Sequence, residues 1–143
     1  MFRFSLLPLF FLISILTSAQ GVDTRWGGLL SRYVDEAGKV DYKSWVDNQE
    51  ELNKYLIELS KHKLGFNSDN EEMAFWMNLY NASTVQKVLQ YYPIKSIKDI
   101  ENGKVWDFKF IKVNGKLLSL NQIENQILRI KFNDPRIHFG INC

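Results

Sequence analysis

The chain has 143 residues, of which 45% are hydrophobic, and its formal net charge is +2. This length is typical of one domain. The near balance of charges gives no reason to expect nucleic acid or an anionic surface as a partner. The only cysteine is Cys143, which excludes a fold stapled by disulfides within the chain.

The first nineteen residues have the pattern of a secretory signal peptide. A basic start that includes Arg3 precedes an apolar run over residues 4–16, and small residues follow up to Ala19. We therefore predict cleavage after Ala19, a periplasmic or extracellular location, and a mature single domain of residues 20–143. The alternative is an uncleaved anchor. The apolar run is too short for that, because a comfortable span needs about 20 residues.

The next part of the chain is predicted to be helical. Apolar residues recur at helical spacing over residues 26–34, 44–61 and 70–91. Ser68 and Glu71 form a capping box ahead of the third helix, and Pro93 follows its end. Residues 96–100 indicate one further helical turn.

The sequence then changes from a helical period to an alternating one. Residues 105–113 alternate, and Asn114-Gly115 predicts a tight hairpin turn because both central residues of that turn need positive φ. Residues 116–118 would form the return strand. Ser119 and Gln122 form another capping box, which begins a helix that extends to about Lys131.

The end of the chain, residues 136–142, is predicted to be a core strand after a turn at residues 133–135. The expected fold class is therefore α+β, with N-terminal helices, one antiparallel hairpin, a further helix and a final core strand. Because the only cysteine comes last and directly follows an apolar run, the domain is expected to continue beyond Cys143.

Asn78 and Asn81 are the most informative polar residues, because they lie three apart in an apolar, aromatic-rich helix and share one of its faces. A buried amide needs hydrogen-bond partners. The pair therefore either bonds to backbone that crosses the helix or lines a ligand site. Trp76 and Tyr80 are four apart on the same helix, and either flank such a site or belong to the core.

His138 and Cys143 are candidates for nucleophilic catalysis. On a strand, His138 would share a polar face with Arg136 and Gly140, and strict alternation would put Cys143 on the opposite face. A Cys–His pair would therefore need a bend at Asn142. A zinc site would need a further cysteine or histidine at suitable spacing, so neither a metal nor another cofactor is expected.

Glu124 and Arg129 lie near the apolar boundary of the helix that follows Ser119. Five residues is not an ideal spacing for an ion pair on an α-helix. If Arg129 points inward, it must be paired with Glu124, Asp134 or Asp107. The alternative is a pair of solvated charges on the surface of the helix.

Several segments together resemble the family called domain of unknown function 547. The resemblance covers nearly all of the mature chain, and it rests on residues 26–34, 38–42, 74–82, 92–97, 119–129 and 134–143. The family has no assigned activity, so the resemblance implies no reaction. Its members usually continue past the position of Cys143 to a further Cys-Pro, and bacterial members often carry signal sequences.

Two hypotheses about function follow. The first is an exported domain that binds a ligand or a protein partner at a polar site between the Asn78/Asn81 helix and the His138 strand. Its ligand-binding residues would be Asn78, Asn81, Tyr80, Glu124 and Arg129. The second is a hydrolase or transferase that uses Cys143 and His138 as catalytic residues. The sequence leaves open whether the protein is an enzyme.

Overall fold

The computed structural model describes residues 17–141, and side chains from residue 24 onward. It confirms the α+β class, with many helices and one two-stranded antiparallel sheet. Most of the predicted signal peptide, residues 1–16, lies outside the described residues, and so do Asn142 and Cys143. The first described helix begins at Thr17, so cleavage after Ala19 would remove only its first three residues.

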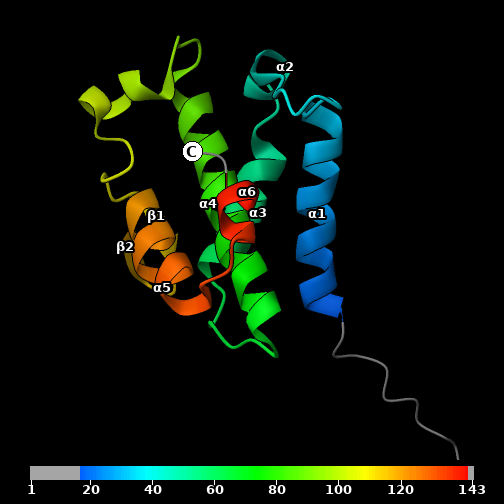
Figure 1. Ribbon diagram of the computed structural model, residues 1–143. Helices are drawn as coiled ribbons and strands as arrows, with labels where there is room; N and C mark the ends of the chain where they lie inside the picture. Colours follow the sequence, from blue (N-terminus) through cyan, green and yellow to red (C-terminus); the bar gives the residue numbers. More distant parts are fainter. Residues whose placement is uncertain (1–16, 142–143) are drawn as a thin grey trace, which may run out of the picture.

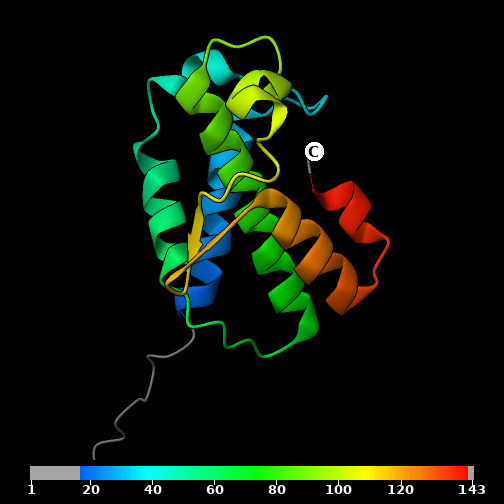
Figure 2. The same cartoon turned by 90° about the vertical axis from the view of Figure 1, so that its left-hand side faces the viewer.

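The elements in chain order are helices α1 (Thr17–Tyr33), α2 (Tyr42–Val46), α3 (Glu50–Ser60) and α4 (Asp69–Tyr91), the 3₁₀ segment η1 (Ile97–Gly103), strands β1 (Ile111–Val113) and β2 (Lys116–Leu118), the π-helix η2 (Gln122–Leu128), and helices α5 (Arg129–Phe132) and α6 (Arg136–Gly140). Helix α4 runs through the middle of the molecule (Figures 1 and 2). Helices α2 and α3 contact one side of α4, and η2 contacts the other.

Helix α4 is buried around most of its circumference, which explains its central position. Its buried residues include Met73, Phe75, Trp76, Leu79, Tyr80, Ala82, Val85, Val88 and Leu89. A helix that is apolar on all sides is stable only when other elements cover every side. Ser68 caps its N-terminus by accepting a hydrogen bond from the backbone N–H of Glu71, which is one half of the predicted capping box, whereas the Glu71 carboxylate accepts from the backbone N–H of Asn67. Trp76 and Tyr80 both belong to the core.

The single helix predicted over residues 44–61 is wrong, because two helices occupy this region. Helix α2 ends at Val46 and α3 begins at Glu50. The side chain of Asn48 donates to the backbone oxygen of Ser44, and its N–H donates to the backbone oxygen of Trp45. Asn and Asp side chains compete with the helical hydrogen bonds of the backbone, so this polar stretch separates two short helices.

The hairpin turn is confirmed, but the strand before it is shorter than predicted. Asn114 and Gly115 have φ of 45° and 75°, and Ile111 pairs with Leu118. The first strand starts at Ile111 instead of Val105. A strand extends only as far as its partner does, and β2 ends at Leu118 because Ser119 already belongs to the next turn: its hydroxyl accepts a hydrogen bond from the backbone N–H of Gln122, and its own N–H donates to Oε1 of Gln122.

The predicted final core strand is wrong, because residues 136–140 form the short helix α6. Ile137 and Ile141 are both buried and lie four residues apart, which is a helical spacing, whereas Phe139 between them is 92% exposed. The carboxylate of Asp134 accepts a hydrogen bond from the backbone N–H of Arg136 and so caps the first turn. A proline directly before the first turn also favours a helix start, as Pro135 does here.

Candidate functional site

The π-helix η2 brings Glu124 and Arg129 together. In a π-helix the backbone bonds join residues five apart, as from the Arg129 N–H to the Glu124 oxygen. Side chains five apart are then neighbours. Glu124 Oε1 accepts hydrogen bonds from Arg129 Nε at 3.2 Å and from Nη2 at 2.6 Å. On the α-helix that the sequence predicts, this spacing would not suit an ion pair, whereas on the π-helix it does.

Glu124 connects this ion pair to the central helix. Its side chain is buried, and its second carboxylate oxygen, Oε2, accepts a long hydrogen bond of 3.4 Å from the hydroxyl of Tyr80. A buried carboxylate is costly unless it is paired and hydrogen-bonded. Here Arg129 provides the opposite charge. The Arg129 side chain is 42% exposed, so its guanidinium pairs with Glu124 on one side and faces solvent on the other side.

The C-terminal end of α6 is attached to α4. Asn81 Nδ2 donates a 2.7 Å hydrogen bond to the backbone oxygen of Gly140. A Cβ at position 140 would lie only 1.7 Å from Cε of Met77, so the side chain of Met77 occupies the space that glycine leaves. Asn78 lies between Met77 and Asn81 in the sequence and is half-buried. The Asn81 amide therefore bonds to a crossing backbone, as one of the sequence readings predicts.

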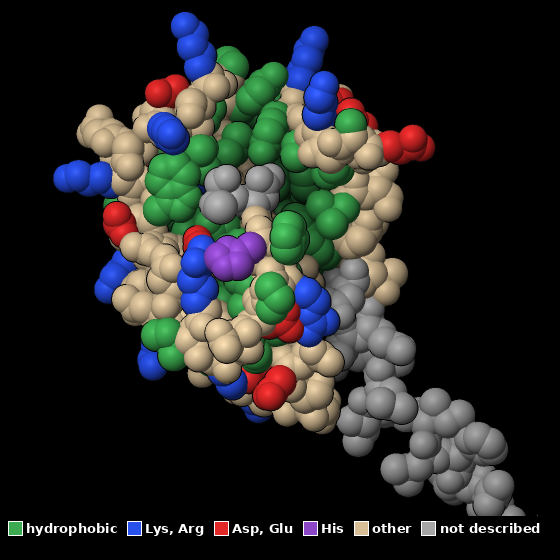
Figure 3. Space-filling view, in the orientation of Figure 1, with side chains coloured by type: hydrophobic (Ala, Val, Ile, Leu, Met, Phe, Trp, Pro, Cys, Tyr) green, Lys and Arg blue, Asp and Glu red, His purple; other side chains and the backbone are tan. Residues whose placement is uncertain are grey.

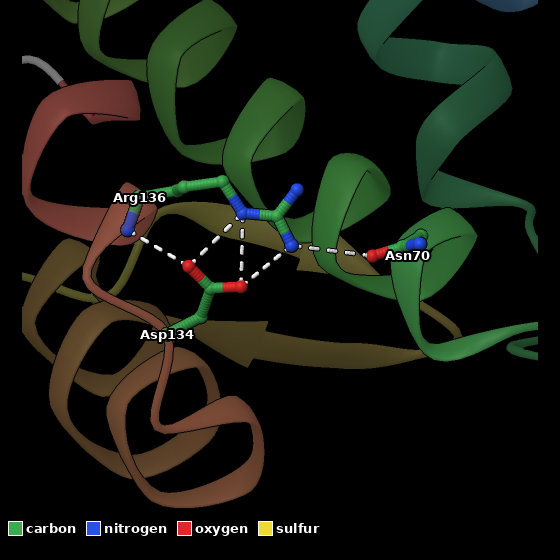
Figure 4. Close-up of polar contacts among 3 residues, drawn as sticks. All are labelled: Asn70, Asp134 and Arg136. Carbon is green, nitrogen blue, oxygen red and sulfur yellow. Dashed lines mark hydrogen bonds and ion pairs between the residues drawn. The ribbon is translucent and has the colours of Figure 1, made fainter.

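The other end of α6 is held by a second set of polar contacts, which Figure 4 shows. Arg136 Nε and Nη2 lie 2.9 Å and 2.6 Å from Asp134 Oδ2, and Nη2 also lies 3.4 Å from Oδ1 of Asn70 in the first turn of α4. The guanidinium beside Asp134 holds the pKa of that carboxyl below its ordinary value. Both ends of α6 therefore contact α4, and the part of Asp134 and Arg136 in this attachment was not predicted from the sequence.

An open hollow of about 360 Å³ lies where α5 and α6 meet, and we call it the α5–α6 hollow. Its walls are formed by Arg129, Asn133, Asp134, Pro135, Ile137 and His138. His138 is exposed on α6. Figure 3 shows the face that carries these helices: hydrophobic side chains gather in a recess in its upper half, and charged side chains lie along its margins and in its lower half.

The structure brings together some of the predicted site residues. Tyr80, Glu124 and Arg129 form one connected set, Arg129 and His138 line the same hollow, and Asn81 contacts the segment that carries His138. Cys143 lies outside the described residues, so a catalytic pair of Cys143 and His138 stays a prediction. Among the side chains that the structure describes, no three His, Cys, Asp or Glu residues are arranged to hold a metal ion.

The geometry defines an α+β fold with a hollow between α5 and α6, lined by both charged and apolar side chains. The family model described as "Protein of unknown function, DUF547" matches residues 64–143, more than half of the chain. The protein belongs to this family. The matched region contains α4, η2, α5 and α6, which are the elements that form the candidate site. No curated protein and no solved structure matches the chain.

Proposed function

We propose that this protein is an exported binding domain whose ligand occupies the α5–α6 hollow. The observation that carries the proposal is the half-exposed guanidinium of Arg129, which is paired with buried Glu124 and lines the same hollow as His138. Pockets that bind ligands combine a concave surface with a few fixed polar groups. A π-helix is rare and occurs frequently at functional sites, which supports a role for η2 beyond packing.

Each residue of the site has a distinct part in this proposal. Arg129 and His138 contact the ligand, because both side chains offer N–H donors to a carboxylate, phosphate or carbonyl oxygen. Tyr80 and Glu124 position the guanidinium. Asn81 positions α6, and through α6 it positions His138. Asn78 lies three residues before Asn81 on the same face of α4, and it does not line the hollow.

The binding proposal is tested with a conservative substitution. A panel of small carboxylates, phosphates and short peptides is screened by thermal shift against the wild type and Arg129→Lys. Lysine keeps the charge beside Glu124 but loses the planar fork of donors. We expect ligands that stabilise the wild type to lose affinity at least about tenfold in Arg129→Lys, a cost of about 1.4 kcal/mol.

Arg32→Lys is the matched control, because Arg32 is an exposed arginine on α1 paired with Glu51 Oε2 at 2.8 Å. It should bind as the wild type does. ¹⁵N chemical-shift mapping with the best compound should move signals of residues 129–138. Shifts confined to other parts of the protein would show that the hollow is not the binding site.

Export is proposed on the pattern of residues 1–19 alone, and it has its own experiment. The full chain is expressed in a bacterial host and the mature N-terminus is determined by mass spectrometry. We expect a chain that begins at Gln20 in the periplasmic fraction. Ala19→Leu places a large residue at the cleavage position and should leave the precursor uncleaved. A cytoplasmic chain that still begins at Met1 or Phe2 would refute export.

A further inference from the structure

The near balance of charge over the whole chain conceals a local excess of positive charge around the hairpin. Residues 104–118 contain four lysines and one acidic residue, Asp107. Their formal charge of +3 exceeds the +2 of the entire chain, so the remaining residues together are slightly acidic. A charge that is concentrated on one segment attracts an oppositely charged partner in a way that the net charge of the protein does not reveal.

Exposed apolar side chains lie among these lysines. We define the hairpin patch as Phe108, Lys109, Lys112, Lys116 and Leu117, all of which are exposed. Lys112 on β1 is the direct cross-strand partner of Leu117 on β2, so an ammonium group and an apolar side chain are neighbours on the same face. Leu117 is 56% exposed and Phe108 is 44% exposed.

The lysines of the hairpin patch form no ion pair within the part of the chain whose side chains the structure describes. Among the side chains that the structure describes, the lysines in ion pairs are Lys54, Lys87 and Lys131, and none of them belongs to the patch. Asp107, the one acidic residue of the segment, accepts a 2.8 Å hydrogen bond from Asn121 Nδ2. The patch lysines are therefore available to an external anion.

A buried cation fixes the aromatic part of the surface. The ammonium group of Lys87 lies 4.8 Å from the ring centroid of Phe108 and 5.0 Å from that of Phe110, and it pairs with Glu101 at 2.9 Å. The two phenylalanine rings lie 6.4 Å apart. These contacts hold Phe108 beside the hairpin, so little conformational freedom is lost when the patch meets a partner.

We propose that the hairpin patch is a docking surface for an anionic lipid membrane. Unpaired lysines around exposed leucine and phenylalanine side chains match a surface of negative headgroups above an apolar layer. Segment 104–118 contains no arginine, the residue that most often makes specific contacts with nucleic acids. The hairpin lies on the side of the molecule away from α1, and η2 and α5 separate it from α6 (Figures 1 and 2). Membrane docking would therefore leave the α5–α6 hollow accessible.

This surface differs from a membrane-spanning segment. None of the helices within residues 17–141 is both long and apolar enough to cross a bilayer. The proposal is independent of the ligand proposed for the hollow, because the two surfaces share no residue.

The test compares two double variants that remove the same charge. The patch variant combines Lys112→Gln with Lys116→Gln. The control variant combines Lys39→Gln, in the turn before α2, with Lys43→Gln, in α2. Both control lysines are exposed, and α2 lies far from the hairpin (Figure 1). Binding of the protein is measured by co-sedimentation with phosphatidylcholine vesicles that contain or lack phosphatidylglycerol. We expect the patch variant to bind the anionic vesicles about thirtyfold more weakly than the wild type, and the control variant to bind nearly as the wild type does.

A third variant, Leu117→Ser, tests the apolar contribution. It should weaken binding to anionic vesicles without changing the unfolding midpoint, because the side chain of Leu117 is mostly exposed. Failure of the wild type to sediment with anionic vesicles would overturn the proposal. Equal losses in the two double variants would also overturn it, as would binding to a DNA duplex that is tighter than binding to the vesicles.

Discussion

Gly140 on α6 lies against the side chain of Met77 on α4, and its substitution should be destabilising. In Gly140→Val, the new side chain would occupy the space of the Met77 methyl group, since a Cβ alone would lie 1.7 Å from it. Overpacking of this kind costs about 1–3 kcal/mol. The contact is with the end of a flexible methionine side chain, so we expect a loss at the low end of this range, about 1 kcal/mol, in urea unfolding. Met77→Ala should recover at least half of the loss in the double variant, and purely additive effects would contradict the close contact.

Glu124 and Arg129 should contribute unequally to stability when each is removed. Arg129→Met leaves the buried carboxylate of Glu124 without its opposite charge, whereas Glu124→Gln leaves a half-exposed arginine that water can solvate. We expect Arg129→Met to cost about 2 kcal/mol, less than a fully buried pair would, and Glu124→Gln about 1 kcal/mol. Urea denaturation of both variants measures the difference, and a larger loss in Glu124→Gln would contradict this account.

At the scale of single residues, the sequence is most predictive where one local rule decides the outcome. The capping residue Ser68 and the turn Asn114-Gly115 are confirmed because each depends on the backbone within a few residues. The Glu124–Arg129 pair is different, because it depends on whether the backbone bonds to the fourth or the fifth preceding residue. No local signal in residues 119–129 distinguishes these two bonding patterns.

At the scale of elements, the attachment of η1 to α4 should depend on pH. The hydrogen bond from Lys87, and next that from Tyr91, hold the pKa of Glu101 below its ordinary value. A carboxyl whose folded pKa is lowered stabilises the fold above its unfolded pKa, which is about 4.3. That contribution is lost as the pH falls through the lower, folded pKa, when Glu101 becomes protonated in the native state.

We therefore expect the difference in unfolding free energy between the wild type and Glu101→Gln to be largest near neutral pH and to shrink below about pH 4. Urea titrations of both proteins across this range measure the difference. Subtraction removes the contributions of Asp41, Glu50 and Asp134, whose pKa values are also lowered by hydrogen bonds. A difference that does not vary with pH would show that the Lys87–Glu101 pair is not linked to folding.

The boundaries of the elements are less predictable than their types. Residues 136–142 alternate between polar and apolar, which favours a strand, but Ile137 and Ile141 also fit one face of a short helix. Five residues cannot separate these periods. The Asp134-Pro135 pair favours the helix, and this start signal is the feature that the strand prediction undervalued. The break at Asn48 is similar, because a polar stretch of three residues outweighs the helical pattern around it.

At the scale of the whole molecule, the candidate site depends on contacts between segments far apart in the sequence. Asn81 and Gly140 are 59 residues apart, and Tyr80 and Glu124 are 44 apart. The sequence predicts that the Asn78/Asn81 helix and the His138 segment meet, because each presents polar groups that need partners. It does not predict that His138 would line a hollow with Arg129, since that arrangement follows from the helical form of α6.

The contrast between the buried central helix and the short α6 predicts two levels of protection in amide hydrogen exchange. Amides in the middle of α4, around Leu79 and Ala82, should exchange only on global unfolding, because surrounding elements cover them. Helix α6 has five residues and is anchored by Ile137, Ile141 and the polar contacts at its two ends. Its amides should therefore exchange through local opening, at a much lower free energy.

Asn81→Ala tests whether the hydrogen bond to Gly140 controls this opening. Three amides report on α6, because the N–H groups of Ile137, His138 and Ile141 donate to backbone oxygens of residues 134, 135 and 137. Loss of a hydrogen bond worth about 1 kcal/mol should accelerate their exchange about fivefold. Exchange in the middle of α4 should change only as much as the global stability does. NMR exchange rates of the two groups, measured in one sample, separate these effects. Equal acceleration in both groups would mean that Asn81 stabilises the whole fold rather than the position of α6.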